Sequence, residues 1–222
     1  MIKMVIFDMA GTTIEEDNLV YKMVQKALRD FDCSADLNTV LSIAAGKEKR
    51  QALQNVYQHI RGEAPEEALL YQIYRHFEEL LETAYDEHEL KLFDGVLGVL
   101  ESLKERGITR IFNTGYTEDV AEKILQKVDI KEGREIEELI TADMVPHSRP
   151  APDMIQLAMK NWQCTPDQVI KIGDSKVDIE EGKNAGVRFT IGITTGAQQR
   201  EELAEAEPDF IIDSIEDLLK YV

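Results

Sequence analysis

The chain contains few cysteines, an excess of acidic over basic residues and no long apolar run. Only two cysteines, Cys33 and Cys164, occur among its 222 residues, and neither belongs to a Cys-x-x-Cys or Cys/His pattern. The sequence therefore predicts neither a disulfide framework nor a zinc site. The apolar run at the N-terminus ends at Asp8, which is too short for a signal segment or a membrane span. We expect a cytoplasmic protein that does not bind membranes.

The charge balance limits the partners of the protein. The sequence has 25 Lys and Arg against 43 Asp and Glu, a formal net charge of −18. This charge repels the phosphate backbone of nucleic acids, so we expect no nucleic-acid partner. A small anion would instead need a local cationic pocket built from a metal ion, backbone amides and a few basic side chains. The 43% hydrophobic content is sufficient for a sizeable core.

Six short segments combine apolar and β-favouring residues. They are residues 2–7, 108–113, 138–142, 169–173 and 187–193, with 209–212 as a weaker sixth. Helical patterns separate most of them, which predicts parallel crossovers and an α/β fold with a doubly wound, Rossmann-like sheet covered by helices on both faces. This core takes in residues 1–14 and 90–222. Within it, we expect the acidic segment 132–138 to form a solvated loop.

Residues 15–89 form no strand pattern. Apolar residues fall at helical spacing from Leu19 to Phe31 and again from Leu69 to Leu81, and Gly62 and Pro65 mark a break between helices. The sequence therefore predicts a helical cap domain, inserted after the first strand and positioned over the active site.

Two polar segments follow the first two core strands. Ligands of an open parallel sheet bind at the carboxyl ends of the strands. Asp8 ends the first strand and precedes Gly11, which makes it a candidate nucleophile. Thr114 follows the second strand in an Asn-Thr-Gly-Tyr-Thr segment, where its hydroxyl and the amides of a helix start could hold a phosphoryl oxygen.

Two further signals supply charge. Arg149 lies in an Arg-Pro-Ala-Pro-Asp segment, from which it could neutralise both Asp8 and a phosphoryl group. Asp174 and Asp178 lie four residues apart after the 169–173 strand, and carboxylate oxygens suit Mg²⁺. Each signal alone has an ordinary structural explanation, such as a turn or a helix cap.

Together, and in this order, the four segments resemble the motifs of the haloacid dehalogenase superfamily, and the resemblance covers nearly the whole chain. It implies an aspartyl-phosphate mechanism in which Asp8 attacks phosphorus while Thr114 and Arg149 stabilise the oxyanion. It also implies Mg²⁺ held by Asp8, the carbonyl of Ala10 and Asp174, with Asp178 supporting the site. A homodimer formed through the cap is a further implication of the resemblance.

Two departures from the usual motifs resemble the phosphonoacetaldehyde hydrolase branch. Ala10 stands where a second aspartate usually serves as general acid, and Arg149 stands where lysine is usual. In that branch a cap lysine in a Gly-x-x-Lys segment forms an imine with the substrate aldehyde, and Gly46 and Lys49 match this spacing. Ala52 departs from the branch, which has a histidine there, so the substrate could be another small 2-oxoalkyl phosphonate.

The imine role requires a lysine that is neutral near pH 7. Neighbouring Lys47 and Arg50, or burial under the cap, could lower the pKa of Lys49. Lys47 is the second candidate, and the simpler interpretation is that these charges lie on a solvated helix start. The remaining residues expected to bind the substrate or its phosphoryl group are Thr12, Gly46, Lys47, Gly115 and Tyr116.

Three other functions are compatible with parts of this pattern. A phosphatase for small phosphomonoesters, similar to phosphoglycolate phosphatase, would need only the four core motifs. A non-catalytic binding or regulatory protein could have lost the general acid. A phosphoacceptor signalling domain also uses Asp, Thr and a cation, but a cap of this size disfavours it.

Overall fold

The computed structural model describes all residues, 1–222. A six-stranded sheet forms its centre, in the order β5-β4-β1-β6-β7-β8, with every pair of neighbours parallel. The strands are β1 (Met4–Asp8), β4 (Thr109–Thr114), β5 (Glu138–Thr141), β6 (Val169–Gly173), β7 (Phe189–Ile193) and β8 (Phe210–Ile212). The chain starts at the centre and winds outward first on one side and then on the other, which confirms the predicted doubly wound sheet.

The side chains of β1 point alternately to the two faces of the sheet, and both faces are covered. All five residues of this strand are buried. Val5 and Phe7 belong to the core cluster on one face, whereas Met4 and Ile6 belong to a second cluster on the other, because successive side chains of a strand point to opposite faces. A strand buried on both faces must be apolar throughout, and this is the pattern visible in the sequence.

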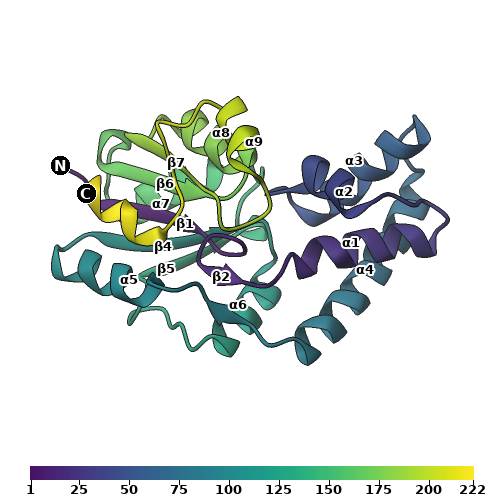
Figure 1. Cartoon of the computed structure of the whole chain (residues 1–222), viewed down its shortest axis with the longest axis horizontal. Coiled ribbons are helices and arrows are strands. Elements are labelled where there is room, and N and C mark those ends of the chain that lie inside the picture. Colours follow the sequence, from purple (N-terminus) through teal and green to yellow (C-terminus); the bar gives the residue numbers. More distant parts are fainter.

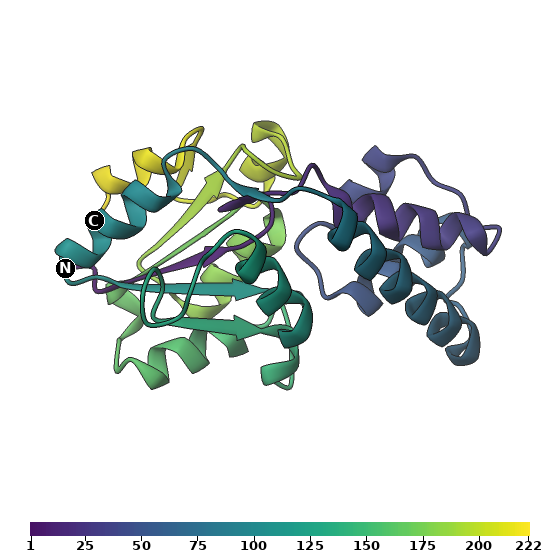
Figure 2. The same cartoon turned by 90° about the horizontal axis from the view of Figure 1, so that it is seen from below.

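Helices and short 3-10 segments complete the two outer layers. They are α5 (Val96–Glu105), α6 (Glu118–Lys127), α7 (Asp153–Asn161), α8 (Lys176–Ala185) and α9 (Arg200–Glu205), with η1 (Ala142–Met144), η2 (Pro166–Gln168) and η3 (Ile215–Lys220). Residues of α5 and η3 pack in the same cluster as Val5, whereas residues of α7 pack with Met4. Figure 2 accordingly shows α5 and α7 on opposite sides of the sheet.

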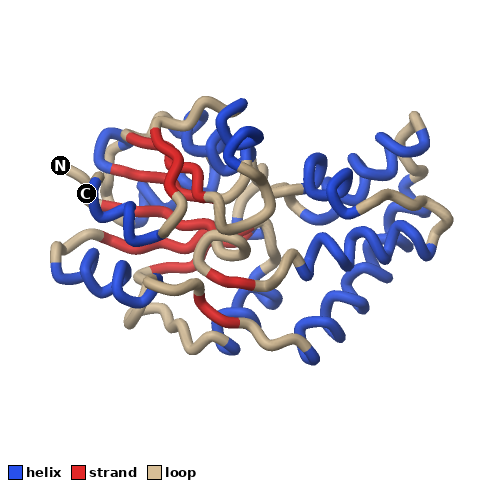
Figure 3. The backbone as a smooth tube through the Cα atoms, in the orientation of Figure 1, coloured by secondary structure: helices blue, strands red, loops and turns tan.

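A second lobe consists of helices without strands (Figures 1 and 3). Its helices are α1 (Leu19–Asp30), α2 (Leu37–Ala44), α3 (Lys49–Arg61) and α4 (Glu67–Glu87). The helical spacing read from the sequence matches α1 and α4, whose buried faces include Val24 and Leu28 of α1 and Phe77 of α4. Gly62, in a left-handed conformation, ends α3, at the break expected there. We keep the name cap for residues 15–89, as proposed from the sequence.

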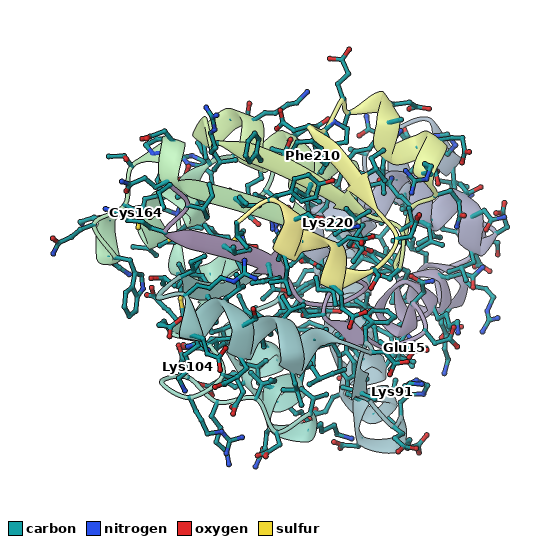
Figure 4. All side chains as sticks on the ribbon, turned by 60° about the vertical axis from the view of Figure 1, so that its left-hand side comes forward. Glu15, Lys91, Lys104, Cys164, Phe210 and Lys220 are labelled. Atoms are coloured by element: carbon teal, nitrogen blue, oxygen red, sulfur yellow. The ribbon has the colours of Figure 1, made fainter.

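The chain enters and leaves the cap through two short strands that sequence analysis missed. β2 (Ile14–Glu15) pairs antiparallel with β3 (Lys91–Leu92). Each strand has two residues, too few to give a periodic pattern. A surface ion pair joins Glu15 and Lys91, with 3.0 Å between Oε2 and Nζ (Figure 4). The two connections to the core therefore lie side by side.

The expectation of a solvated acidic loop at 132–138 was wrong for the C-terminal part of this segment, where Ile136 is buried and Glu138 begins β5. The Glu137 carboxylate accepts hydrogen bonds from the backbone amide and the guanidinium of Arg110, whose side chain is buried. A buried guanidinium requires such a partner, and a pairing between Arg110 in β4 and Glu137, which precedes β5, gives no local sequence signal. None of the helices combines the length and the apolar composition that a membrane span would need.

Candidate active site

A small closed pocket lies where the cap meets the carboxyl ends of the core strands. Its walls are formed by Asp8, Ala10, Tyr21, Gly46, Lys49, Thr114, Gly115, Tyr116, Arg149 and Asp174. Sequence analysis selected all of these except Tyr21. The cavity measures about 10 Å³, room for no more than one water molecule. This arrangement is a closed cap, so a substrate can enter only if the cap moves.

Asp8 ends β1 at the centre of the sheet, beside Asn113 of β4. Arg149 Nη1 donates a hydrogen bond to Asp8 Oδ1 at 2.6 Å. Burial raises the pKa of Asp8, and the charge of Arg149 opposes that rise. The guanidinium therefore favours the ionised carboxylate, the form that can act as a nucleophile. Thr114 is also buried, and its hydroxyl accepts a hydrogen bond from the amide of Tyr116.

A buried network holds Arg149 in place. Its Nη2 donates to the carbonyl of Asn113 at 2.6 Å and to the Asn113 side chain at 2.8 Å. Its Nη1 lies 2.9 Å from Asp178 Oδ1, and its Nε lies 3.2 Å from Glu181 Oε2. All three guanidinium nitrogens are therefore engaged, and Nη1 is shared between Asp8 and Asp178, which holds the group in one orientation toward Asp8.

Lys171 and Glu181 were missed by sequence analysis. Lys171 is fully buried in β6, donates to Asn113 Oδ1 at 2.6 Å and lies 3.0 Å from Asp178 Oδ1. The Glu181 carboxylate accepts two hydrogen bonds from the side-chain amide nitrogen, Nδ2, of Asn113. Lysine in the middle of an apolar strand was the available signal, because a fully buried lysine requires a partner.

Three carboxylates approach closely enough to hold a metal ion. Ligand oxygens of Asp8, Asp174 and Asp178 lie within 4.8 Å of one another. Burial and the nearby charge of Asp8 raise the pKa of Asp174. In contrast, although burial opposes it, Arg149 and Lys171 lower the pKa of Asp178. Asp178 therefore pairs mainly with the cations, which supports its expected place beside the metal site.

The charge count of this cluster fits a divalent cation. It contains four buried carboxylates, counting Glu181, and two cations that form ion pairs with them, Arg149 and Lys171; the buried Lys49 lines the same pocket but forms no salt bridge. Two negative charges therefore remain without a positive partner, and an all-oxygen donor set with this excess suits Mg²⁺.

Gly11 and Gly196 leave room around the Asp174 carboxylate. A Cβ at Gly11 would lie 2.3 Å from Asp174 Oδ2, and one at Gly196 would lie 2.0 Å from the same atom. The amide of Ala197 donates to this oxygen at 2.6 Å. Close backbone approach thus fixes the orientation of the carboxylate, which explains the need for glycine here.

Lys49 is a cap residue that lines the pocket. It is the first residue of α3 and only 7% exposed. Its Nζ donates to the carbonyl of Lys47 at 2.8 Å and lies over the rings of Tyr21 and Tyr116, 5.5 and 5.0 Å from their centroids. Burial lowers the pKa of Lys49, against the opposing charges of Asp8 and Glu16. Burial under the cap, rather than Arg50, which pairs with Glu67 at the surface, therefore lowers the pKa of Lys49 in the direction expected from the sequence.

The turn before Lys49 closes directly on the core. A Cβ at Gly46 would lie 2.2 Å from Ser175 Oγ, and one at Gly115 would lie 3.0 Å from the carbonyl oxygen of Lys47. The amide of Gly46 donates to the Tyr21 hydroxyl at 3.0 Å. Glycines on both sides therefore allow cap and core backbones to touch.

Two residues expected to bind substrate lie outside the pocket wall. The Lys47 side chain is partly buried and does not line it. Thr12 is fully buried and lines a separate cavity of about 230 Å³, whose walls include Glu15 of β2 and Lys91 and Leu92 of β3. The role expected for Thr12 in binding the substrate or its phosphoryl group stays a prediction.

A second group that sequence analysis missed surrounds Lys49. Glu16 is 4% exposed, and its Oε2 accepts hydrogen bonds from the hydroxyls of Tyr85 and Tyr116. The two hydroxyls are 2.8 Å apart. In the sequence, Glu16 is part of an acidic run and Tyr85 lies near the end of a long polar helix, so only the tertiary structure shows that they meet.

The fold and this site define a hydrolase of the haloacid dehalogenase type. The family model for haloacid dehalogenase-like hydrolases matches residues 5–192, and the chain belongs to that family. Among curated proteins, a phosphonoacetaldehyde hydrolase of Bacillus cereus is 32% identical over 89% of this chain and 78% of its own length. One from Bacillus mycoides is 29% identical over 97% of this chain and 86% of its own.

Solved structures show the same fold. A hydrolase from Pseudomonas syringae has a TM-score of 0.87 at 19% identity, covering 99% of this chain and 97% of that one. A phosphonoacetaldehyde hydrolase-like protein from Oleispira antarctica has a TM-score of 0.83 at 22% identity, covering 99% and 91%. A predicted phosphoglycolate phosphatase from Haemophilus somnus has a TM-score of 0.82 at 22% identity, covering 99% and 97%. At these identities the likeness concerns the fold alone.

Proposed function

We propose that the protein is a Mg²⁺-dependent, phosphonatase-like hydrolase that releases phosphate from a small 2-oxoalkyl phosphonate. In this proposal the Asp8 carboxylate attacks phosphorus and forms an aspartyl-phosphate, while Lys49 holds the substrate carbonyl carbon as an imine. The observation that carries the proposal is the position of Lys49, a buried cap lysine that lines the same pocket as Asp8.

The leaving group explains why both residues are needed. Breaking a carbon–phosphorus bond leaves an electron pair on carbon, and an unassisted carbanion is a very poor leaving group. A protonated imine adjacent to that carbon accepts the pair and becomes a neutral enamine. Lys49 reaches the pocket from the cap and Asp8 from the core, so the substrate would lie between them when the cap closes.

Ala10 supports carbon–phosphorus cleavage over ester cleavage. It lines the pocket two residues after Asp8, where a carboxylic acid would protonate the alkoxide released from a phosphate ester. Its methyl group cannot donate a proton. An enamine leaving group needs no proton at that position, because the imine nitrogen already holds the electron pair.

The carboxylates of Asp8 and Asp174, with the carbonyl of Ala10, would hold Mg²⁺ in this proposal. The ion, when bound, would offset the charge of the phosphoryl oxygens and of the nucleophile. Asp178 would keep Arg149 and Lys171 in position through its ion pairs of 2.9 and 3.0 Å. Arg149 and Thr114 would contact the phosphoryl oxygens directly.

The test uses Mg²⁺ with two substrate panels, small 2-oxoalkyl phosphonates and common phosphomonoesters, and measures released phosphate. We expect release from a carbonyl phosphonate that is lost in Lys49→Arg, because arginine cannot form the imine. Lys26→Arg, at an exposed cap lysine, is the matched control and should keep the activity. Loss in Lys47→Arg but not in Lys49→Arg would transfer the imine to Lys47.

Hydrolysis of small phosphomonoesters is the second candidate. Asp8, Thr114 and Arg149 already form the part of the pocket that such a phosphatase needs, all within the core. Phosphate released only from esters, with no change in Lys49→Arg, would establish this function and reject the imine.

A homodimer formed through the cap also remains a proposal. Light scattering on the purified protein would test it, since the predicted dimer has twice the 25.2 kDa mass of the chain. A small phosphonate substrate and the lack of a nucleic-acid or membrane partner are likewise proposed from the acidic composition and the closed pocket.

A further inference from the structure

Glu16 is a buried carboxylate in the candidate site to which the proposed reaction assigns no role. It is 4% exposed, and burial raises its pKa. No lysine or arginine forms a salt bridge with it, and its side-chain hydrogen-bond donors are the two phenols of Tyr85 and Tyr116. Burying a carboxylate without a directly paired cation is unfavourable, and a packed apolar residue would stabilise the cap more. This position therefore requires an explanation other than stability.

The neighbours of Glu16 connect it to Lys49. The Tyr116 hydroxyl donates to Glu16 Oε2 at 3.2 Å, and the ring that carries this hydroxyl lies beneath Lys49 Nζ, 5.0 Å from its centroid. Burial is the largest effect on both groups, and it lowers the pKa of Lys49 and raises that of Glu16. The attraction between the two charges acts in the opposite direction on each pKa and is smaller. Glu16 therefore faces the amine without contacting it directly in the closed structure.

An imine-forming lysine must lose and later supply protons. Its ammonium has to give up a proton before the amine can attack, and the resulting carbinolamine has to gain one before it can release water. Asp8 is engaged by Arg149 at 2.6 Å and is needed as the nucleophile. Glu16 is the remaining buried carboxylate whose charge acts on Lys49.

We propose that Glu16 exchanges protons with Lys49 during imine formation, with the hydroxyl of Tyr116 as the relay and that of Tyr85 fixing the carboxylate. This inference rests on the proposed imine at Lys49. It makes Glu16 a positioning and proton-transfer partner of the lysine and assigns the cap helix α4, through Tyr85, a part in the chemistry.

The proton count of the step is balanced. The Lys49 ammonium gives one proton to the Glu16 carboxylate, and the neutral amine adds to the aldehyde carbon. The second nitrogen proton moves to the former carbonyl oxygen, giving a neutral carbinolamine. Glu16 returns its proton to the carbinolamine hydroxyl, which leaves as water, while the nitrogen lone pair forms the C=N bond. The products are a protonated imine, water and the Glu16 carboxylate, with the same total charge as the reactants.

The experiment measures imine formation alone. The full-length protein is mixed with 2-oxoethyl phosphonate and quenched with borohydride at timed intervals, and the reduced adduct on Lys49 is quantified by mass spectrometry. The variants are Glu16→Gln, Glu16→Asp and Tyr85→Phe. Glu15→Gln is the matched control, because the adjacent carboxylate pairs with Lys91 at the surface. Thermal melting of each variant shows whether it is folded.

We expect Glu16→Gln to lower the maximal rate of imine formation by about a hundredfold, within the range for general acid–base catalysis. The half-saturating substrate concentration should stay within about twofold. Glu16→Asp should recover part of the rate because it restores a carboxylate, and Glu15→Gln should match the wild type. A purely structural role would instead raise the half-saturating concentration and lower Tm without recovery in Glu16→Asp.

Failure of this inference can be distinguished from failure of the proposed function. If the wild type forms an adduct and folded Glu16→Gln forms it at the same rate, the proton-transfer role is wrong while the imine stands. If the wild type forms no adduct at Lys49, both ideas are wrong. If Glu16→Gln does not fold, folded Tyr85→Phe decides the question, and an unchanged rate in that variant overturns the inference.

Discussion

Replacing Gly46 by alanine should selectively weaken cap closure. Gly46 has φ +74°, and a Cβ there would lie 2.2 Å from Ser175 Oγ, whereas ordinary contact begins at 3.4 Å. The turn would have to move away from the core by the difference. Ser175 cannot yield freely, because its hydroxyl donates to Asp178 Oδ2 at 2.5 Å. The clash exists only in the closed state, since Ser175 belongs to the core and Gly46 to the cap.

The magnitude follows from two contributions. A left-handed conformation costs an L-residue roughly 1–2 kcal/mol wherever it occurs, and this affects the open and closed states alike. Overpacking against Ser175 adds about 1–3 kcal/mol, which affects the closed state alone. The second contribution corresponds to a decrease in the closed-to-open ratio of roughly 5-fold to 150-fold. If the closed state is the reactive one, kcat/KM should fall by a similar factor.

Gly62 provides the matched control. It has φ +79°, and a Cβ there would have no heavy atom within 4 Å. Gly62→Ala should therefore lower Tm through backbone strain about as much as Gly46→Ala but leave kcat/KM near the wild-type value. Steady-state kinetics and energy transfer between dyes on the cap and the core measure the two effects. Equal kcat/KM values for the two variants would refute the reasoning, as would an unchanged closed population in Gly46→Ala.

Three further predictions concern the chemical groups. Asp8→Asn should form no phosphorylated enzyme, because an amide is not a nucleophile; acid-quench mass spectrometry showing a normal phosphoryl adduct would remove Asp8 from the mechanism. In Asp174→Asn, the rise of Tm with added Mg²⁺ should disappear. Without metal, the variant should melt no lower than the wild type, because the raised pKa of Asp174 means that its charged form is unfavourable in the folded state. An undiminished Mg²⁺ effect would contradict the metal assignment. Burial lowers the pKa of Lys49 below its ordinary 10.5. The rate of imine formation should therefore increase with pH as the neutral amine appears and become constant below pH 10.5. A rate that still increases at pH 10.5 would show an unperturbed lysine.

Much of the core could be predicted because each buried parallel strand corresponds to one short, continuous apolar segment of the sequence. The run Met4–Asp8 is apolar on both faces, and its last residue must emerge at the edge where ligands bind. The same reasoning located Thr114 and Asp174 at strand ends. It could not find β2 and β3, which have two residues each and form only because the chain crosses between the lobes at one place.

The candidate site was predicted where one segment carries the signal and missed where two distant segments combine. Glu16 and Tyr85 are separated by 69 residues, and their contact depends on how α1 and α4 pack. Lys171 was treated as part of an apolar strand, although an isolated lysine among buried residues indicates a charged partner across the sheet. Thr12 shows a further limit, since its place near Asp8 in the sequence does not determine which cavity its side chain lines.

The β2–β3 connection has a consequence for how such an enzyme can change over evolution. The two ends of the cap lie in register, with Ile14 opposite Leu92 and Glu15 opposite Lys91. An insertion whose ends are adjacent can be lengthened, replaced or exchanged without rearranging the host domain. In the proposed mechanism, the nucleophile Asp8 and its cations come from the host and the amine of Lys49 comes from the insert. A change of substrate could therefore arise by exchanging the cap while the residues proposed to act on phosphorus stay unchanged. A chimera carrying another cap between residues 15 and 91 would be a practical route to a new specificity.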